Sequence, residues 1–224
     1  MYDRKTYPAY HTLKKIRRNV LDDKAVIHVT DFGSGSRVFS SNERKVSAIA
    51  KNAGVTYKRQ KLLFRMAQYF KPTALLELGT SLGLGTAALS LGNPSGNITT
   101  VEGCPNISQR ATQVFEGFQL KNINLQNNTF EDFFKTEATP AYDLIYVDGN
   151  HDKEKTLQYF EVLLEKTQND SLIIFDDIYW SKGMTEAWDF IVQHPKITVS
   201  IDLFYWGLVF FRREQKKQHF RIRL

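Results

Sequence analysis

The chain has 224 residues, of which 42% are hydrophobic and 24% are charged. This composition is typical of a globular domain, and it excludes a disordered or collagen-like chain. The single cysteine, Cys104, excludes an intrachain disulfide and a cysteine-based zinc cluster. There are 30 Lys and Arg residues against 24 Asp and Glu. The resulting net charge of +6 would by itself suggest a nucleic-acid partner.

The positive charge is concentrated at the two ends of the chain. Residues 1–24 carry a net charge of +4 and residues 212–224 carry +5, so the residues between them carry −3. A mildly acidic body is unlike a groove that follows phosphates. We therefore expect solvated terminal segments and no nucleic-acid partner. An RNA or protein substrate guided by the basic tails stays as the alternative.

The apolar runs are too short for a membrane protein. Residues 172–175 and 208–211 are far below the length that spans a bilayer. The charged start of the chain lacks the apolar run of an export signal. We expect a cytoplasmic protein with no membrane partner.

The first 56 residues are expected to form a helical cap. Apolar spacing predicts helices over residues 8–21 and 43–53, and a third helix over 58–70 opens the main domain, which spans residues 57–224. Between the first two helices, residues 31–37 are rich in Gly and Ser. We expect this loop to be part of a lid that helps to exclude water from a site.

From residue 74 onward, β-prone runs alternate with amphipathic helical stretches. Strands separated by helices indicate crossover units and a parallel sheet. The last two runs, 197–204 and 208–211, are separated by only three residues, so they must form an antiparallel hairpin. We expect an α/β fold with seven strands, mostly parallel, in which the last strand is antiparallel. The first five strands are predicted over residues 74–78, 97–101, 123–125, 142–147 and 171–175.

A glycine-rich loop follows the first of these strands and opens a helix over residues 84–91. Its glycines permit a sharp turn and close approach of a ligand, and the helix start offers unpaired N–H groups. The glycine order differs from the G-x-G-x-x-G dinucleotide fingerprint. Glu77, two residues before the first glycine, suits a positively charged ligand better than a diphosphate. An ordinary strand-to-helix turn stays as the alternative.

Glu102 ends the second predicted strand. A carboxylate at this place can accept hydrogen bonds from both ribose hydroxyls of an adenosine. The alternative is a surface glutamate. Together with the loop, Glu102 predicts an adenosyl ligand that carries a positive group.

Two segments resemble motifs of a known family. Residues 75–86, LLELGTSLGLGT, and residues 100–103, TVEG, resemble the first and second motifs of class I S-adenosylmethionine-dependent methyltransferases. Over residues 57–211 the resemblance is to small-molecule O-methyltransferases of the catechol and caffeoyl-CoA kind. It implies a Rossmann-like, doubly wound sheet. It also implies that the methionine part of S-adenosylmethionine is held by Glu77, Gly79, Thr80, Ser81, Gly83 and Gly85, the ribose by Glu102, and the adenine by Thr129 and Phe130.

Three carboxylates follow the fourth and fifth predicted strands: Asp148, Asp176 and Asp177. In an open α/β sheet, ligands bind at the carboxyl ends of the strands, so these side chains should converge beside the cofactor. Crowded carboxylates raise one another's pKa, and Mg²⁺ would relieve the repulsion. The resemblance implies a metal site here, with an Asp-Asn pair after the fifth strand; Asp177 departs from that pattern. A turn and a helix cap are the alternatives.

His151 stands where the metal-dependent enzymes place a lysine base. A histidine titrates near neutral pH and can take a proton from a hydroxyl, so His151 and Asp148 are the predicted catalytic pair. The alternative is a neighbour of a helix N-cap with no chemistry. Asp148 is also a predicted cofactor contact. Aromatic residues near the strand ends could line a substrate pocket or pack in the core: Tyr179, Trp180, Tyr205 and Trp206.

The sequence thus favours methylation of a small-molecule hydroxyl by S-adenosylmethionine, with or without Mg²⁺. The Asn/Asp-Pro-Pro-aromatic run of base methyltransferases is absent after the fourth strand, where the chain has DGNH. A nucleotide-binding scaffold is a further alternative, a nicotinamide dehydrogenase is disfavoured by the glycine order, and a homodimer is left open.

Overall fold

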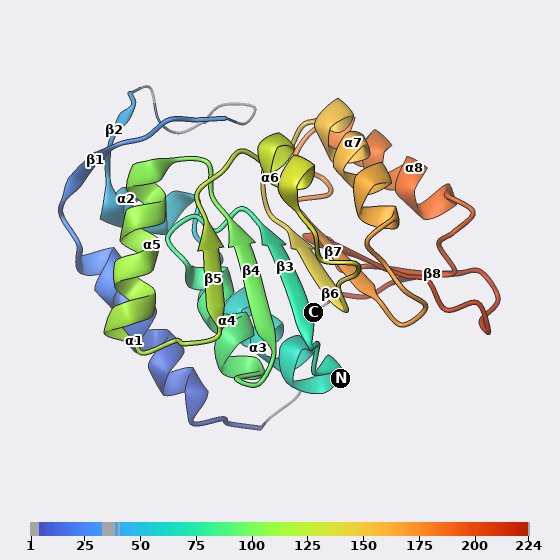
Figure 1. Ribbon diagram of the computed structural model, residues 1–224, viewed down its shortest axis with the longest axis horizontal. Coiled ribbons are helices and arrows are strands. Elements are labelled where there is room, and N and C mark those ends of the chain that lie inside the picture. Colours follow the sequence, from blue (N-terminus) through green and yellow to red (C-terminus); the bar gives the residue numbers. More distant parts are fainter. Residues whose placement is uncertain (1–4, 33–38, 40, 224) are drawn as a thin grey trace.

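A single eight-stranded sheet organises the molecule (Figure 1). The computed structural model describes residues 5–32, 39 and 41–223. The strand order is β10-β8-β9-β7-β6-β3-β4-β5, with β9 antiparallel to both β7 and β8 and all other pairs parallel. The strands are β3 (Ala74–Leu78), β4 (Asn97–Val101), β5 (Ile123–Gln126), β6 (Leu144–Val147), β7 (Leu172–Asp176), β8 (Val199–Asp202), β9 (Trp206–Phe210) and β10 (Gln218–Arg221).

Helices cover both faces of this sheet, and each face has its own apolar cluster. The central strands β6 and β7 are buried along their whole length, as expected for parallel strands covered on both sides. One cluster includes side chains from α1 (Ala9–Asp22), α2 (Val46–Asn52), α3 (Tyr57–Phe70), α4 (Leu84–Gly92) and α5 (Pro105–Gly117). The other includes side chains from α6 (Phe130–Thr136), α7 (Lys153–Leu164) and α8 (Lys182–Gln193). The expected doubly wound α/β fold is confirmed. The antiparallel strand that was expected as the seventh is β9.

The N-terminal helices pack onto the sheet domain, since α1 contacts α2, α3 and α4. The second helix begins at Val46 and not at residue 43. Residues 43–45 instead form β2 (Glu43–Lys45), which pairs antiparallel with β1 (Val26–His28). Most of the expected lid loop, residues 33–37, lies outside the described residues. Among the described residues, no helix combines the length and apolar character needed to cross a membrane.

The C-terminal end differs from the expectation in two ways. The connection between β8 and β9 is residues 203–205, so Trp206 and Gly207 belong to β9. Glycine is needed there because a Cβ at Gly207 would overlap the ring of Trp188. The basic tail also adds β10, which pairs with β8 at the edge of the sheet. Without β10, the outer edge of β8 would expose unpaired backbone groups.

Candidate cofactor and acceptor site

The glycine-rich loop connects β3 to α4 at the carboxyl end of the sheet. Gly79 and Gly83 have positive φ values of 101° and 77°, and Ser81 between them has φ 48°. A Cβ at Gly79 would overlap the carbonyl oxygen of Asp148, so only glycine lets the loop pass this close to the end of β6. Backbone strain at non-glycine residues is typical of functional loops. The loop is thus shaped by contact with the segment that carries the predicted acceptor site.

Glu77 is buried at 1% exposure beneath this loop. Its Oε2 accepts hydrogen bonds from the hydroxyls of Thr86 and Thr100, the latter at 2.6 Å. Burial raises the pKa of Glu77 to about 7, although the two hydroxyls favour the charged form. A Cβ at Gly85 would lie 2.8 Å from Glu77 Oε1, so the glycine leaves room for this carboxylate. A positively charged ligand would stabilise the ionised form.

Glu102 follows β4, and its carboxylate faces the same loop. Oε2 accepts from the Ser81 N–H and Oε1 from the Cys104 N–H, each at 2.9 Å. Burial raises the pKa of Glu102, while these N–H groups favour its ionised form. The two backbone contacts orient the carboxylate toward the place where the resemblance puts a ribose.

The predicted adenine contacts lie at the start of α6. The Thr129 hydroxyl caps this helix by accepting from the Asp132 N–H at 3.1 Å. The Phe130 ring packs closely on Gly149, since a Cβ at Gly149 would lie only 2.8 Å from it. Phe32, in the described start of the expected lid loop, has its ring against Gly103 and is 54% exposed.

A small pocket lies between the glycine-rich loop and the connection from α2 to α3. Its volume is about 10 Å³, which is room for a single water. A ligand the size of S-adenosylmethionine must extend beyond this pocket or displace the covering residues 53–55. The pocket is lined by Ala53, Gly54, Val55, Glu77, Gly79, Thr80, Ser81, Leu82, Leu84, Gly85 and Asp148.

Two of the three predicted metal ligands share one hydroxyl. The hydroxyl of Tyr146, on β6, lies 2.9 Å from Asp148 Oδ2 and 3.0 Å from Asp176 Oδ2. Burial raises the pKa of Asp148 to about 7 and the pKa of Asp176 well above its usual value. The carboxylates of Asp148 and Asp176 therefore converge as expected, but they meet at the hydroxyl of Tyr146.

Arg59, from α3, supplies the positive charge at this cluster. Its Nη1 lies 3.2 Å from Asp176 Oδ1 and its Nη2 lies 3.5 Å from Asp177 Oδ1. The resemblance implied an Mg²⁺ site formed by these carboxylates and Asp148. Within the described parts of the chain, no group of three His, Cys, Asp or Glu side chains is arranged to hold a metal ion. Because a guanidinium already pairs with two of the carboxylates, the residues present do not fit a divalent metal.

His151 lies beside the cluster without a hydrogen bond to it. Its Nε2 is 3.8 Å from Asp148 Oδ1, beyond hydrogen-bond distance. Asp152 caps α7 by accepting from the Lys155 N–H at 3.0 Å, so His151 is the neighbour of the cap. Asn150 and His151 both have positive φ values, 67° and 34°. The loop thus holds His151 in a strained position next to Asp148.

Aromatic side chains extend from the cluster to a larger cavity. The Tyr205 ring lies under the Arg59 guanidinium at 4.3 Å and contacts the Phe204 ring at 5.2 Å. Phe204 in turn contacts Tyr179 at 5.9 Å. Trp206, by contrast, is 1% exposed and packs on Tyr146, so it belongs to the core and not to a pocket.

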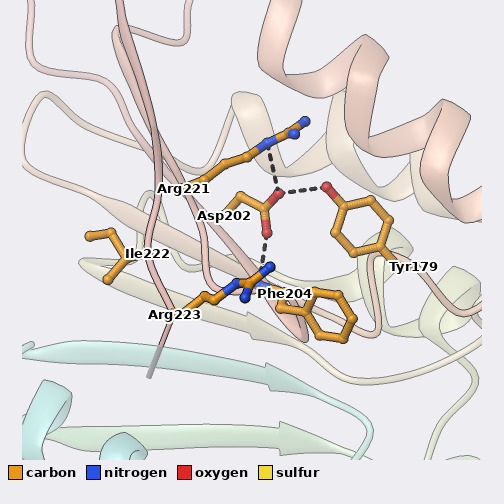
Figure 2. A pocket seen from close by; sticks show the side chains of 6 residues that line it. All are labelled: Tyr179, Asp202, Phe204, Arg221, Ile222 and Arg223. Carbon is orange, nitrogen blue, oxygen red and sulfur yellow. Dashed lines mark hydrogen bonds and ion pairs between the residues drawn. The ribbon is translucent and has the colours of Figure 1, made fainter.

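Figure 2 shows this cavity, which has a volume of about 710 Å³. At its centre, the buried carboxylate of Asp202 accepts from the hydroxyl of Tyr179 and the N–H of Phe204 and pairs with Arg221 at 3.4 Å. Arg221 comes from β10, so the added strand forms one wall. The cavity is lined by Tyr179, Asp202, Phe204, Arg221, Ile222 and Arg223.

Sequence reasoning missed Arg59 and Tyr146. Arg59 shares the apolar stripe of α3 with Leu63 and Met66, at positions i, i+4 and i+7. A cation on a buried stripe requires a partner, and that was the available signal. Tyr146 lies inside a run of four buried strand residues, where a hydroxyl gives little signal.

Residues 76–178 match the model of a family described as a methyltransferase domain. A search of curated proteins finds no significant match. Three solved structures are similar over most of the chain. The O-methyltransferase TomG from Streptomyces achromogenes, solved with S-adenosylmethionine, has 15% identity and a TM-score of 0.66, covering 93% of this chain and 91% of its own.

The other two structures were solved with S-adenosylhomocysteine. An O-methyltransferase from Bacillus cereus has 17% identity and a TM-score of 0.62, covering 92% of this chain and 90% of its own. A methyltransferase from Podospora anserina has 14% identity and a TM-score of 0.64, covering 95% of this chain and 100% of its own. At these identities the likeness shows a shared fold.

The chain shares its fold with two solved O-methyltransferases and one further methyltransferase. Residues 76–178, which are less than half of the chain, match the model of a methyltransferase domain, and the chain as a whole shares the fold of these solved methyltransferases. The roles of the individual site residues stay predictions.

Proposed function

We propose that the chain transfers the methyl group of S-adenosylmethionine to a hydroxyl of a small molecule. The observation that carries the proposal is the position of Asp148. Its carbonyl oxygen packs against Gly79 of the glycine-rich loop, and its carboxylate joins Tyr146 and Asp176. A cofactor on the loop and an acceptor at the carboxylate cluster would therefore meet at one residue.

The residues around the loop suit each part of the cofactor. Glu77 complements a positive group, Glu102 a ribose diol, and the N-terminus of α4 a carboxylate. Phe130 offers an apolar ring for the adenine. Gly79 and Gly85 allow the loop to pack closely against Asp148 and Glu77. S-adenosylmethionine supplies an electrophilic methyl group on sulfur.

The acceptor side provides a base and a means of orientation. His151 accepts the hydroxyl proton at Nε2, and Asp148 stabilises the imidazolium that results. The acceptor oxygen forms a bond to the methyl carbon while the bond from that carbon to sulfur breaks. Alignment of these three atoms contributes most of the rate, so the rigid loops at Gly79 and Asp148 are the main contribution of the protein. No step passes through a divalent metal, since the residues do not fit one.

A small, partly aromatic acceptor would fit the larger cavity, which shares no lining residue with the carboxylate cluster. The cavity of about 710 Å³ falls in the range of small-molecule sites, and Tyr179 and Phe204 offer flat apolar faces. Arg221, one of the basic tail residues, already pairs with Asp202 and forms a wall of this cavity. These features favour a small molecule over the RNA or protein acceptor that the basic tails suggested.

The test is an acceptor screen with methyl-labelled S-adenosylmethionine. Hydroxylated small molecules, bulk RNA and bulk protein are compared as acceptors, and label transfer is measured. We expect label in a hydroxylated small molecule, with a loss of about 100-fold in His151→Gln, the typical contribution of a general base. Glu161→Gln, an exposed change on α7, is the matched control and should keep full activity. Label that enters only RNA or protein would contradict the proposal.

A further inference from the structure

We propose that Arg59 is a built-in cation of the acceptor site, and that the carboxylates of Asp148, Asp176 and Asp177 therefore bind no divalent metal. The inference rests on the proposed function only in taking this cluster as the acceptor site. Arg59 is thus a positioning residue, which acts by holding the carboxylates. The claim concerns metal binding, so it can be tested without a known acceptor.

The contacts of Arg59 use the two carboxylates that an ion would need. Its guanidinium bridges Asp176 on one side and Asp177 on the other, at 3.2 and 3.5 Å. Asp176 Oδ1 also accepts from the Asp177 N–H at 2.7 Å, and Asp176 Oδ2 accepts from the Tyr146 hydroxyl. The same hydroxyl lies 2.9 Å from Asp148 Oδ2, and its single proton is shared between these two carboxylates. Asp176 therefore has a protein donor at each of its oxygens.

The guanidinium is also held from the aromatic side. Its Cζ lies 4.3 Å from the centroid of Tyr205 and 5.9 Å from that of Trp206. Its side chain is 21% exposed. A planar guanidinium can stack on a ring and pair with two carboxylates at once, which a compact ammonium cannot do as well. The packing therefore places Arg59 between the aromatic residues and the carboxylates.

Charge balance agrees with this arrangement. An arginine stays protonated at every physiological pH, so its charge is permanent. A divalent cation at Asp176 and Asp177 would have to displace it or lie beside it, against like-charge repulsion. Asp177, where the resemblance implied Asn, adds a negative charge that the guanidinium matches. Arg59 thus pairs with the carboxylate at which this chain departs from the family pattern.

The test is a titration with Mn²⁺, followed by electron paramagnetic resonance, which reports the free ion. For the wild-type chain we expect no site with a dissociation constant below about 1 mM, the weak end of protein carboxylate sites. Arg59→Gln should gain one Mn²⁺ site per chain, and the double variant Arg59→Gln/Asp176→Asn should lose it. Arg59→Lys should restore exclusion of the ion. Arg65→Gln, on the same helix, is the matched control and should resemble the wild type.

One Mn²⁺ bound by the wild type, and lost in Asp176→Asn, would overturn the inference. So would a folded Arg59→Gln variant that gains no site, since another group would then exclude the metal. Melting curves establish whether the variants are folded, and the wild-type titration decides the claim if they are not. Cofactor binding is measured separately, so its failure would contradict the proposed function and leave the metal result unaffected.

Discussion

At the scale of single residues, the site is built from acids whose environments oppose their ionisation. Glu77 is buried beneath the loop, and Asp148 shares the Tyr146 hydroxyl with Asp176. Burial raises the pKa of both Glu77 and Asp148 to about 7. Such shifts are typical of functional sites, because a structural surface acid has no reason to be desolvated.

Glu77 links cofactor affinity to pH. Below a pH of about 7 its carboxyl is mainly protonated, and a positive ligand must lower its pKa by displacing the proton. We therefore expect S-adenosylmethionine to bind more tightly as the pH rises from 6 to 8, with up to about tenfold per unit below the pKa. Calorimetry over this range measures the slope.

The variant Glu77→Gln separates this residue from its neighbours. Its amide oxygen still accepts from Thr86 and Thr100, but it cannot ionise. In this variant, the affinity for S-adenosylmethionine should change less with pH, and the remaining pH dependence should be the part that Asp148 contributes. An unchanged slope in this variant would show that Glu77 does not face the positive group of the ligand.

At the scale of elements, the arrangement of the strands brings the site together. The ends of β3 and β6 meet at Gly79 and Asp148, and α3 reaches across the end of β7 with Arg59. The added strand β10 closes the other side, where Arg221 pairs with Asp202 of β8. The glycine-rich loop and the larger cavity thus depend on different parts of the chain.

Deletion of β10 tests its role as an edge strand. A chain that ends at residue 213 exposes the backbone of β8, which favours pairing with other molecules. We expect a loss of about 1–2 kcal/mol in the free energy of unfolding and a fall of several degrees in melting temperature. Lys216→Gln removes one exposed charge and keeps the strand, so it serves as the control. An unchanged melting temperature and unchanged self-association would mean that β10 contributes nothing to stability.

At the scale of the whole molecule, apolar runs made the main sheet predictable. Strands β3, β6 and β7 are short, largely buried runs, and the three-residue spacing before β9 forced an antiparallel pair. The residues 43–45, ERK, have no apolar pattern, and β10 is exposed throughout, so neither strand could be predicted from hydropathy. Both exist because a neighbouring strand offers unpaired backbone groups.

The site was predictable where strand ends determine it. Glu77, Glu102 and the three aspartates follow directly from the parallel sheet, whose carboxyl ends meet at one edge. Arg59 depends on how α3 packs across that edge, about 120 residues away in the chain from its partners. The only local sign of this long-range pair in the sequence is a charged residue on the apolar face of the predicted helix. This pair is the basis of our proposal that the carboxylates bind no divalent metal.

The most direct test of the account is calorimetry of S-adenosylhomocysteine binding to the wild-type chain and to Glu102→Gln. The account predicts one site per chain, and an affinity about tenfold or more weaker in the variant, because hydrogen bonds to a charged group contribute about 1.5–3 kcal/mol. Glu161→Gln should bind as the wild type does. Absence of binding by the wild-type chain at millimolar ligand would contradict the central claim that the glycine-rich loop and Glu102 form a cofactor site.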